Sequence, residues 1–112
     1  MIKQTLYAQY IREREGFEII ESEDYFVIYK IRNNELFIAH MYVKPKLRKH
    51  GLAGIMTREL KKIAKLHNCK GIVGTIDLSV GDPSNTLHAA LKIGFKVYKA
   101  IDDIIIIGIN LT

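Results

Sequence analysis

The apolar positions near the start of the chain recur at the spacing of a helix. Ile2, Leu6 and Tyr10 are four residues apart, and further apolar side chains stand beside them. Gly16 then supplies a residue that readily adopts the left-handed conformation found after helix C-termini. This pattern predicts a helix over residues 2–14.

Short runs of β-branched and aromatic residues follow this helix and predict strands. Asn33 and Asn34 separate two of the runs and suit a tight turn, because asparagine tolerates positive φ. Pro45 ends the last run, since proline cannot donate a backbone hydrogen bond within a sheet. We therefore expect an antiparallel meander with strands at residues 17–20, 25–32 and 35–43.

A second helical pattern spans residues 51–67. Apolar side chains such as Leu52, Met56 and Leu60 fall on one face of this helix, and basic residues occupy the other. Further along, Asp82 followed by proline matches the N-cap and first position of a shorter helix. The other elements are expected as a strand at 71–78, that shorter helix ending at Gly94, and strands at 95–101 and 104–109 that pair across Asp102 and Asp103.

The order of these elements predicts an α/β fold with a mixed sheet and helices on its faces. The four isoleucines from Ile104 to Ile107 are expected to be covered on both faces, because an exposed run of this kind promotes aggregation. If this terminal strand were the edge of the sheet, it would be able to pair between subunits. A homodimer is therefore one open expectation for the oligomeric state.

Length and composition favour a single domain. With 112 residues, 48% of them apolar, the chain is long enough to bury a core as one domain over residues 1–112. Its longest apolar run, residues 104–109, is far shorter than the roughly 20 residues that span a bilayer. The start lacks the pattern of a secretory signal. One cysteine, Cys69, and scattered histidines provide no disulfide and no metal-binding spacing, so we expect a cytoplasmic protein without a metal.

The net charge of +5 is concentrated in one segment, because residues 36–58 contain five basic residues and no acidic one. This segment joins the end of a predicted strand to the start of a helix, where unpaired backbone N–H groups favour anions. Gly51, Ala53 and Gly54 leave room for a phosphate to approach the backbone. The segment is a candidate phosphate-binding loop, and close packing of the helix on the sheet is the alternative reason for its small residues.

At this segment the chain resembles a known family. The motif V-x-P-x-x-R-x-x-G-L-A at residues 43–53 is similar to R/Q-x-x-G-x-G/A, the pyrophosphate-binding motif of the GNAT superfamily of acetyl-CoA-dependent N-acetyltransferases. The family has a second signature, an asparagine ahead of a helix that ends in Gly-Phe. Asn85 and the pair Gly94-Phe95 resemble this signature, and the order of elements agrees over about residues 1–110.

The resemblance implies a GNAT-like acyl-CoA N-acyltransferase fold, with acetyl-CoA as co-substrate. In the family, the strand before the loop parts from its neighbour and its backbone binds the pantetheine arm, while the loop amides hold the pyrophosphate and the asparagine contacts the arm. The corresponding residues here are Met41, Tyr42 and Val43 for the arm, Arg48, Lys49, His50, Gly51, Leu52, Ala53 and Gly54 for the pyrophosphate, and Asn85 for the further contact.

The chain also departs from the family pattern. The usual first strand is missing and the two initial helices are expected as one, which removes part of the acceptor-side wall. Many members carry a tyrosine four residues before the Gly-Phe pair, thought to protonate the departing thiolate, and here that position is Ala90. A general acid is therefore not identified.

His40 is one candidate for a catalytic base, since it titrates in a suitable range. Strict alternation along the strand, however, would place His40 and Tyr42 on one face and Phe37, Ala39 and Met41 on the other, from which the family's bases usually project. An ordinary, partly buried histidine is the alternative. By family analogy, the backbone N–H of Val43 would stabilise the oxyanion.

Four further side chains are candidates for a part in catalysis. Asp77 stands near the end of the following strand, where a solvated acid is the alternative, and Ser79 beside it could orient a water molecule. His88 on the shorter helix could act as acid or base, and Tyr98 could supply a hydroxyl near the thiol.

Three functions remain open from the sequence. The first is an N-acetyltransferase that transfers the acetyl group of acetyl-CoA directly to an amine of a small molecule, a peptide N-terminus or a lysine, in a ternary complex. The second, motivated by Ala90 and the shortened start, is a non-catalytic GNAT-fold module that binds CoA or a protein. The third is nucleic-acid binding through the basic segment, which offers few aromatic side chains for stacking.

Overall fold

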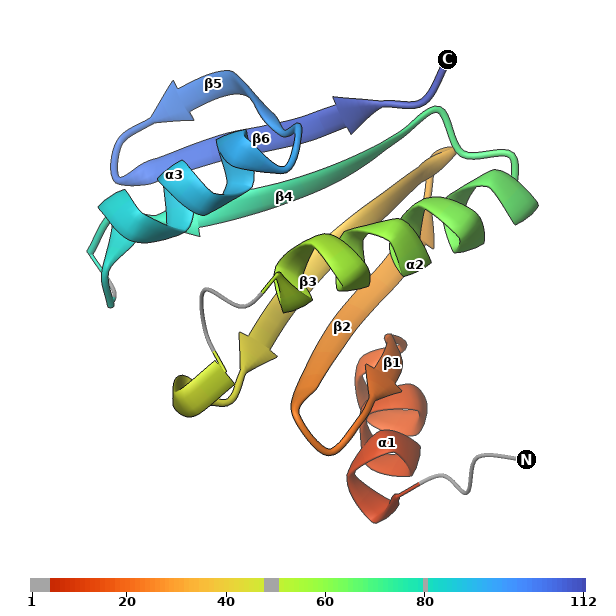
Figure 1. Ribbon diagram of the computed structural model, residues 1–112. Helices are drawn as coiled ribbons and strands as arrows, with labels where there is room; N and C mark the ends of the chain where they lie inside the picture. Colours follow the sequence, from red (N-terminus) through yellow and green to blue (C-terminus); the bar gives the residue numbers. More distant parts are fainter. Residues whose placement is uncertain (1–4, 48–50, 80) are drawn as a thin grey trace.

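A computed structural model describes residues 5–47, 51–79 and 81–112 (Figure 1). The chain begins with α1 (Leu6–Tyr10), which continues as a π-helical turn over Ile11–Glu15. The elements that follow are β1 (Glu18–Glu21), β2 (Tyr25–Arg32), β3 (Glu35–Val43), a 3-10 turn (Pro45–Leu47), α2 (Leu52–Leu66), β4 (Gly71–Asp77), α3 (Pro83–Lys92), β5 (Lys96–Ile101) and β6 (Ile104–Asn110).

The described strands form one six-stranded sheet in the order β1-β2-β3-β4-β6-β5. The first three strands pair antiparallel as the predicted meander, and β3 pairs parallel with β4. Strand β6 is antiparallel to both β4 and β5. The expected α/β fold with a mixed sheet is therefore confirmed.

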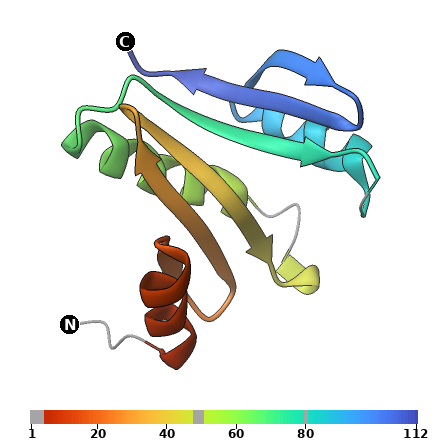
Figure 2. The same cartoon turned by 180° about the vertical axis from the view of Figure 1, so that it is seen from behind.

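Helices lie on both faces of this sheet. Helices α2 and α3 cover one face in Figure 1, and Figure 2 shows the strands in front of them from the opposite side. On that opposite side α1 packs against β2, where the ring of Tyr7 meets Phe26 edge-on at 6.5 Å and Phe26 stacks on Tyr42 of β3 at 5.6 Å. The main core lies under α2 and α3, and its most deeply buried members are Val27, Leu36, Met56, Leu60 and Ile72.

The local signals for turns and caps are confirmed by the backbone. Gly16 is the left-handed cap after the first helix, with φ of 71°. Asn33 and Asn34 both have positive φ, 52° and 63°, and join β2 to β3. Asp82 caps α3 through its side chain, and Gly51 is the N-cap of α2.

Two expectations about the terminal isoleucine strand are wrong. β6 lies between β4 and β5, so the edge of the sheet is β5 and not the isoleucine strand. Ile107 is buried, but Ile104 is 43% exposed. The helix on the side of Ile104 is α1, and it packs against β2, at the opposite end of the sheet. The isoleucine run is therefore covered on both faces only in part.

Strand β3 contains a bulge that overturns the expected alternation. Ile38 pairs with Tyr29 and His40 pairs with Ile28, so Ala39 is an extra residue in β3. Because a bulge inserts one residue, the side chains after it change phase. Through the register with β2, His40 lies on the same face as Phe37, contrary to the expectation from strict alternation. It still lies opposite Met41, as that expectation had it.

Candidate functional site

Strands β3 and β4 part at their carboxyl ends. Their parallel pairing runs from Glu35 opposite Gly71 to Ile38 opposite Gly74, and both strands then continue without further pairing to each other. Figure 1 shows the two strands diverging toward those ends. The predicted pantetheine-binding residues Met41, Tyr42 and Val43 all lie on the diverging part of β3.

The start of α2 lies beside this divergence (Figure 1). Gly51 is the N-cap with φ of 82°, and it makes no side-chain cap. The N–H groups of Leu52, Ala53 and Gly54 stand in the first turn, where a helix has no internal acceptor for them. A side chain at Gly51 would extend into open space, so the space beside this backbone is free among the described residues.

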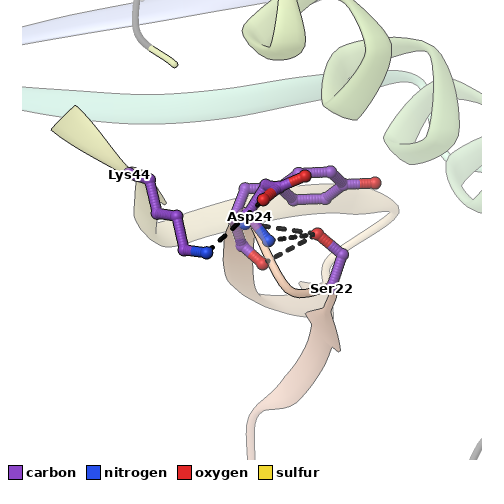
Figure 3. Close-up of polar contacts among 4 residues, drawn as sticks. Ser22, Asp24 and Lys44 are labelled. Atoms are coloured by element: carbon purple, nitrogen blue, oxygen red, sulfur yellow. Dashed lines mark hydrogen bonds and ion pairs between the residues drawn. The ribbon is translucent and has the colours of Figure 1, made fainter. Parts of the chain in front are cut away.

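The structure describes only part of the predicted basic loop. The predicted contacts of Arg48, Lys49 and His50 lie outside the described residues. Lys44 is engaged elsewhere, because its Nζ lies 3.6 Å from Asp24 Oδ1 and its backbone N–H donates to the carbonyl of Asp24 (Figure 3). Lys44 therefore fixes the end of β3 to the turn between β1 and β2, a partner 20 positions away that charge counting along the sequence missed.

Asn85 takes part in the cap of α3. Its side-chain Nδ2 donates to Asp82 Oδ2 at 2.7 Å, while its backbone N–H donates to the other carboxylate oxygen at 3.3 Å. The cap itself was expected from the sequence, but the side-chain bond was not. In this arrangement the amide of Asn85 stabilises the first turn of the helix, and its contact with the cofactor stays a prediction.

Asp77 is an oriented carboxylate at the carboxyl end of β4. Its Oδ1 accepts two hydrogen bonds from Ser79, one from the hydroxyl at 2.6 Å and one from the backbone N–H at 2.9 Å. These bonds favour the ionised form, so they hold the pKa of Asp77 below its ordinary value. Ser79, which the sequence suggested as an orienter of water, instead orients this acid.

The other catalytic candidates are not gathered around one point. His40 is exposed on the α1 face of the sheet, whereas His88 is exposed on α3, which covers the opposite face (Figure 1). Tyr98 sits on the edge strand β5 at a second bulge, and its ring lies over Gly108. Since Gly108 is opposite Val73, within the closed part of the sheet, Tyr98 lies away from the divergence.

A hollow that the sequence did not predict adjoins the end of β4. Its volume is about 450 Å³, and it is bounded by the end of β4, the turn between β5 and β6, and the start of β6. The sequence identified Asp102 and Asp103 only as turn residues, and the pairing of β4 with β6 is what brings them beside Asp77. The lining residues are Thr75, Asp77, Ser79, Ile101, Asp102, Asp103, Ile104 and Ile106.

Other classes of site find little support in the described residues. Residues 5–47, 51–79 and 81–112 contain no group of three histidine, cysteine, aspartate or glutamate side chains that could hold a metal ion. Within the same ranges, every helix is too short or too polar to cross a lipid bilayer. Cys69 is buried, and its burial raises the pKa of the thiol, as suits a small core residue.

Solved structures of acetyltransferases share this fold. The PaiA N-acetyltransferase from Thermoplasma acidophilum, solved with coenzyme A, superposes with a TM-score of 0.73 at 19% identity over 89% of this chain and 65% of that one. A putative streptothricin acetyltransferase from Bacillus anthracis, solved with acetyl coenzyme A, gives a TM-score of 0.75 at 19% identity over 98% and 70%. An IAA acetyltransferase from Bacillus cereus gives 0.73 at 15% identity over 94% and 83%.

These identities are low enough that the structures establish the fold alone, and the chain spans less than two thirds of the Thermoplasma protein. None of the curated proteins matches the chain. The family itself follows from the sequence, because the model of the acetyltransferase (GNAT) family matches residues 7–95, from α1 to the start of β5. The chain with the parted strands and the open start of α2 therefore belongs to the acetyltransferase (GNAT) family.

Proposed function

We propose that this protein is an N-acetyltransferase that transfers the acetyl group of acetyl-CoA directly to an amine within a ternary complex. The observation that carries the proposal is the divergence of β3 and β4 next to a helix start that presents backbone N–H groups and no capping side chain. Family membership supports the same reaction.

The residues present fit the co-substrate. The pyrophosphate carries negative charge, and the first turn of α2 offers N–H donors at the positive end of a helix dipole. Gly51 leaves this approach open. The pantetheine arm is extended and has amide groups, which suits the space between two parted strands. Met41 on the diverging part of β3 would lie along that arm.

The reaction needs few protein groups. A neutral amine attacks the thioester carbonyl carbon, a carbon–nitrogen bond forms, the carbon–sulfur bond breaks, and the sulfur leaves with the electron pair. The amine loses one proton and the thiolate gains one. The chain's contribution is to hold the two substrates in line, which is itself a large part of the barrier reduction.

The identity of a general acid or base remains a prediction for His40, Asp77, His88 and Tyr98. Asp77 is a poor base for an amine, because its lowered pKa makes it a weak proton acceptor near pH 7. Ala90 occupies the position of the tyrosine that many members use, and it packs against the hydrophobic core. The thiolate therefore has no donor at that position.

Binding of acetyl-CoA tests the proposal. At about 100 times its dissociation constant the ligand should add roughly 2.7 kcal/mol of stability, measured as a rise in thermal midpoint. Gly51→Val should abolish this rise, because its side chain occupies the space beside the helix start and its backbone resists φ of 82°.

A matched variant separates the local effect from backbone strain. Gly16 has φ of 71° and equally open surroundings, but it lies after the first helix. Gly16→Val should lower the stability of the free protein as Gly51→Val does, yet retain the response to acetyl-CoA. Absence of any stabilisation of the unmodified protein would refute the proposed function.

A CoA-binding module without catalysis is the second candidate, and the packed Ala90 is the observation that favours it. Release of free thiol from acetyl-CoA across a panel of amines and peptides distinguishes the two. Turnover that depends on the amine establishes the transferase, whereas binding without turnover establishes the module.

The oligomeric state is a separate proposal. A homodimer that pairs through the C-terminal edge of the sheet would use β5, since β5 and not β6 is that edge. Tyr98 and Ile101 of this strand are about half exposed, at 51% and 46%. Sedimentation equilibrium tests this directly, and a monomer across the concentration range would exclude the dimer.

A further inference from the structure

Within the sheet, the end of β3 has a neighbouring strand on one side only. Beyond Ile38 it no longer pairs with β4, whereas its pairing with β2 continues as far as Val43, which lies opposite Tyr25. The direction of the last backbone groups of β3 therefore depends on the contacts with β2 and with the turn that precedes β2.

The phase of the hydrogen bonds between β2 and β3 directs the N–H of Val43. The N–H of Lys44 donates to the carbonyl of Asp24 at 2.8 Å, so these two residues form a hydrogen-bonded pair. In an antiparallel ladder such pairs alternate with pairs whose backbone groups point away from the partner strand. Tyr25 and Val43 form the next pair, so the N–H of Val43 is directed to the side on which β4 departs. This is the N–H that is expected to stabilise the oxyanion.

The turn that contacts Lys44 is itself fixed by hydrogen bonds (Figure 3). Ser22 Oγ accepts from the backbone N–H of Asp24 at 3.1 Å and from that of Tyr25 at 3.2 Å. The backbone N–H of Ser22 donates to the carbonyl of Tyr25 at 2.9 Å. Asp24 therefore stands on a fixed turn and presents both its carbonyl and its carboxylate to Lys44.

Global stability does not account for the ion pair in this turn. Lys44 Nζ and Asp24 Oδ1 are 3.6 Å apart, and the two side chains are 56% and 46% exposed. An exposed pair of this kind contributes little to the free energy of unfolding. It does, however, join the residue after Val43 to a fixed turn, so its effect is on local geometry.

We propose that Asp24 is a positioning residue: through Lys44, it aims the N–H of Val43 at the carbonyl oxygen that becomes the oxyanion. Ser22 supports this role because it fixes the turn. A donor that is held in place before charge develops on the oxygen lowers the barrier more than one that must first reorient. The inference rests on the proposed function, since the oxyanion forms only during acetyl transfer.

Turnover tests the role of Asp24. Asp24→Asn removes the charge of the pair, and combination with Ser22→Ala also removes the hydroxyl that fixes the turn. The double variant should lower kcat for thiol release by about tenfold, because loss of an oxyanion donor costs roughly 100- to 1,000-fold and its displacement costs part of that. The KM for acetyl-CoA should change by less than about twofold, since the contact acts mainly in the transition state.

A spectroscopic measurement reports the same contact without turnover. The infrared stretching band of an isotope-labelled thioester carbonyl moves to lower wavenumber when its oxygen accepts a hydrogen bond. Acetyl-CoA bound to the parent protein should show this shift relative to acetyl-CoA in water-free solvent, and acetyl-CoA bound to the double variant should show less of it.

The ion pair between Arg12 and Glu18 provides a matched control. Glu18 belongs to β1, the strand before the same turn, and the pair is shorter, with 2.8 Å between Arg12 Nη2 and Glu18 Oε2. Its side chains are similarly exposed, at 37% and 49%. Glu18→Gln should therefore lower the thermal midpoint at least as much as Asp24→Asn, yet leave kcat and the carbonyl band unchanged.

The outcomes separate this proposal from the proposed function. An unchanged kcat and an unchanged carbonyl band in the double variant would overturn the role of Asp24 and leave the acetyltransferase intact. Equal losses of kcat in the double variant and in Glu18→Gln would also overturn it, because they would show a general effect of stability. Where the parent protein binds acetyl-CoA without turnover, the carbonyl band alone decides. Failure of the parent protein to bind acetyl-CoA refutes the proposed function.

Discussion

At the scale of single residues, the site depends on a few positions whose neighbours fix their conformation. Gly51 places the start of α2 through its positive φ, and Ser79 orients Asp77 through two hydrogen bonds. Lys44, which adds to the local charge in the sequence, is paired with Asp24. The chemistry available at each position therefore follows from its partners as much as from its residue type.

The effect of Ser79 on Asp77 predicts a titration shift. The folded pKa of Asp77 lies below its unfolded value near 4, so its stabilising contribution is present above that value and is lost as the pH falls through the folded pKa. Ser79→Ala removes the hydroxyl bond and should raise the pKa toward the ordinary value, as measured by NMR titration of the carboxyl carbon. Ser22→Ala, in a different turn, should leave this pKa unchanged, and an unmoved pKa in Ser79→Ala would contradict the assignment.

The sequence predicts residue roles best where the cause is local. Positive φ at Asn33 and Asn34 and the cap by Asp82 all follow from the conformational preferences of those residues. The bond from Asn85 to Asp82 spans three positions and was within reach, because an amide at N3 can return to its cap. The pair of Lys44 with Asp24 depends on strand register, so the sequence alone could not provide it.

At the scale of elements, the bulge at Ala39 lies where β3 parts from β4. The bulge lies next to Ile38, the last residue of β3 that pairs with β4. A bulge bends its strand and increases the local twist, so its position is well suited to start the divergence. The sequence predicted the bounds of α2 to within one residue at each end. It did not predict the bulge in β3, because no glycine or proline marks that position.

Deletion of Ala39 tests this role. The residues after the bulge would keep their faces and their partners in β2, because the deletion restores simple alternation. We expect the variant to fold with a thermal midpoint close to that of the parent protein, but to bind acetyl-CoA at least about tenfold more weakly, a loss of about 1.4 kcal/mol. Ala39→Val keeps the residue count and should retain binding. Full acetyl-CoA affinity in the folded deletion variant would show that the divergence has another cause.

At the scale of the whole molecule, one core joins the two parts of the sheet. Only four residue pairs connect β3 with β4, yet α2 lies across both strands and buries its apolar face against them (Figure 1). The core unites Val27 and Leu36 on one side with Ile72 and Ile107 on the other. The two halves should therefore unfold together in one transition.

Leu60 tests this coupling because it is fully buried in α2, with 0% exposure. Leu60→Ala should lower the free energy of unfolding by about 3 kcal/mol and keep a single transition in urea. Leu66 in the same helix is 82% exposed, so Leu66→Ala should change stability by less than about 0.5 kcal/mol. Two separate transitions in the Leu60 variant would show that the halves are independent.

The order of the last two strands shows why topology was predicted only in part. Adjacent strands were correctly paired as a hairpin, but a hairpin leaves open which of its strands joins the rest of the sheet. The signal was present in composition, since β5 carries Lys96 and Lys99 as edge strands often do, while β6 is nearly all isoleucine. The hollow depended on this choice, because β6 beside β4 is what places Asp102 near Asp77.

The position of β5 at the edge has a further consequence for colloidal behaviour. This strand shields one side of β6, and the ring of Tyr98 lies on Gly108 in the middle of that contact. Detachment of β5 alone would leave a row of isoleucines with unpaired backbone groups, which is the arrangement that seeds fibrils. The rate of aggregation should therefore follow the local opening of one lysine-bearing strand, and a cross-link between β5 and β6 should suppress it even where global stability is unchanged.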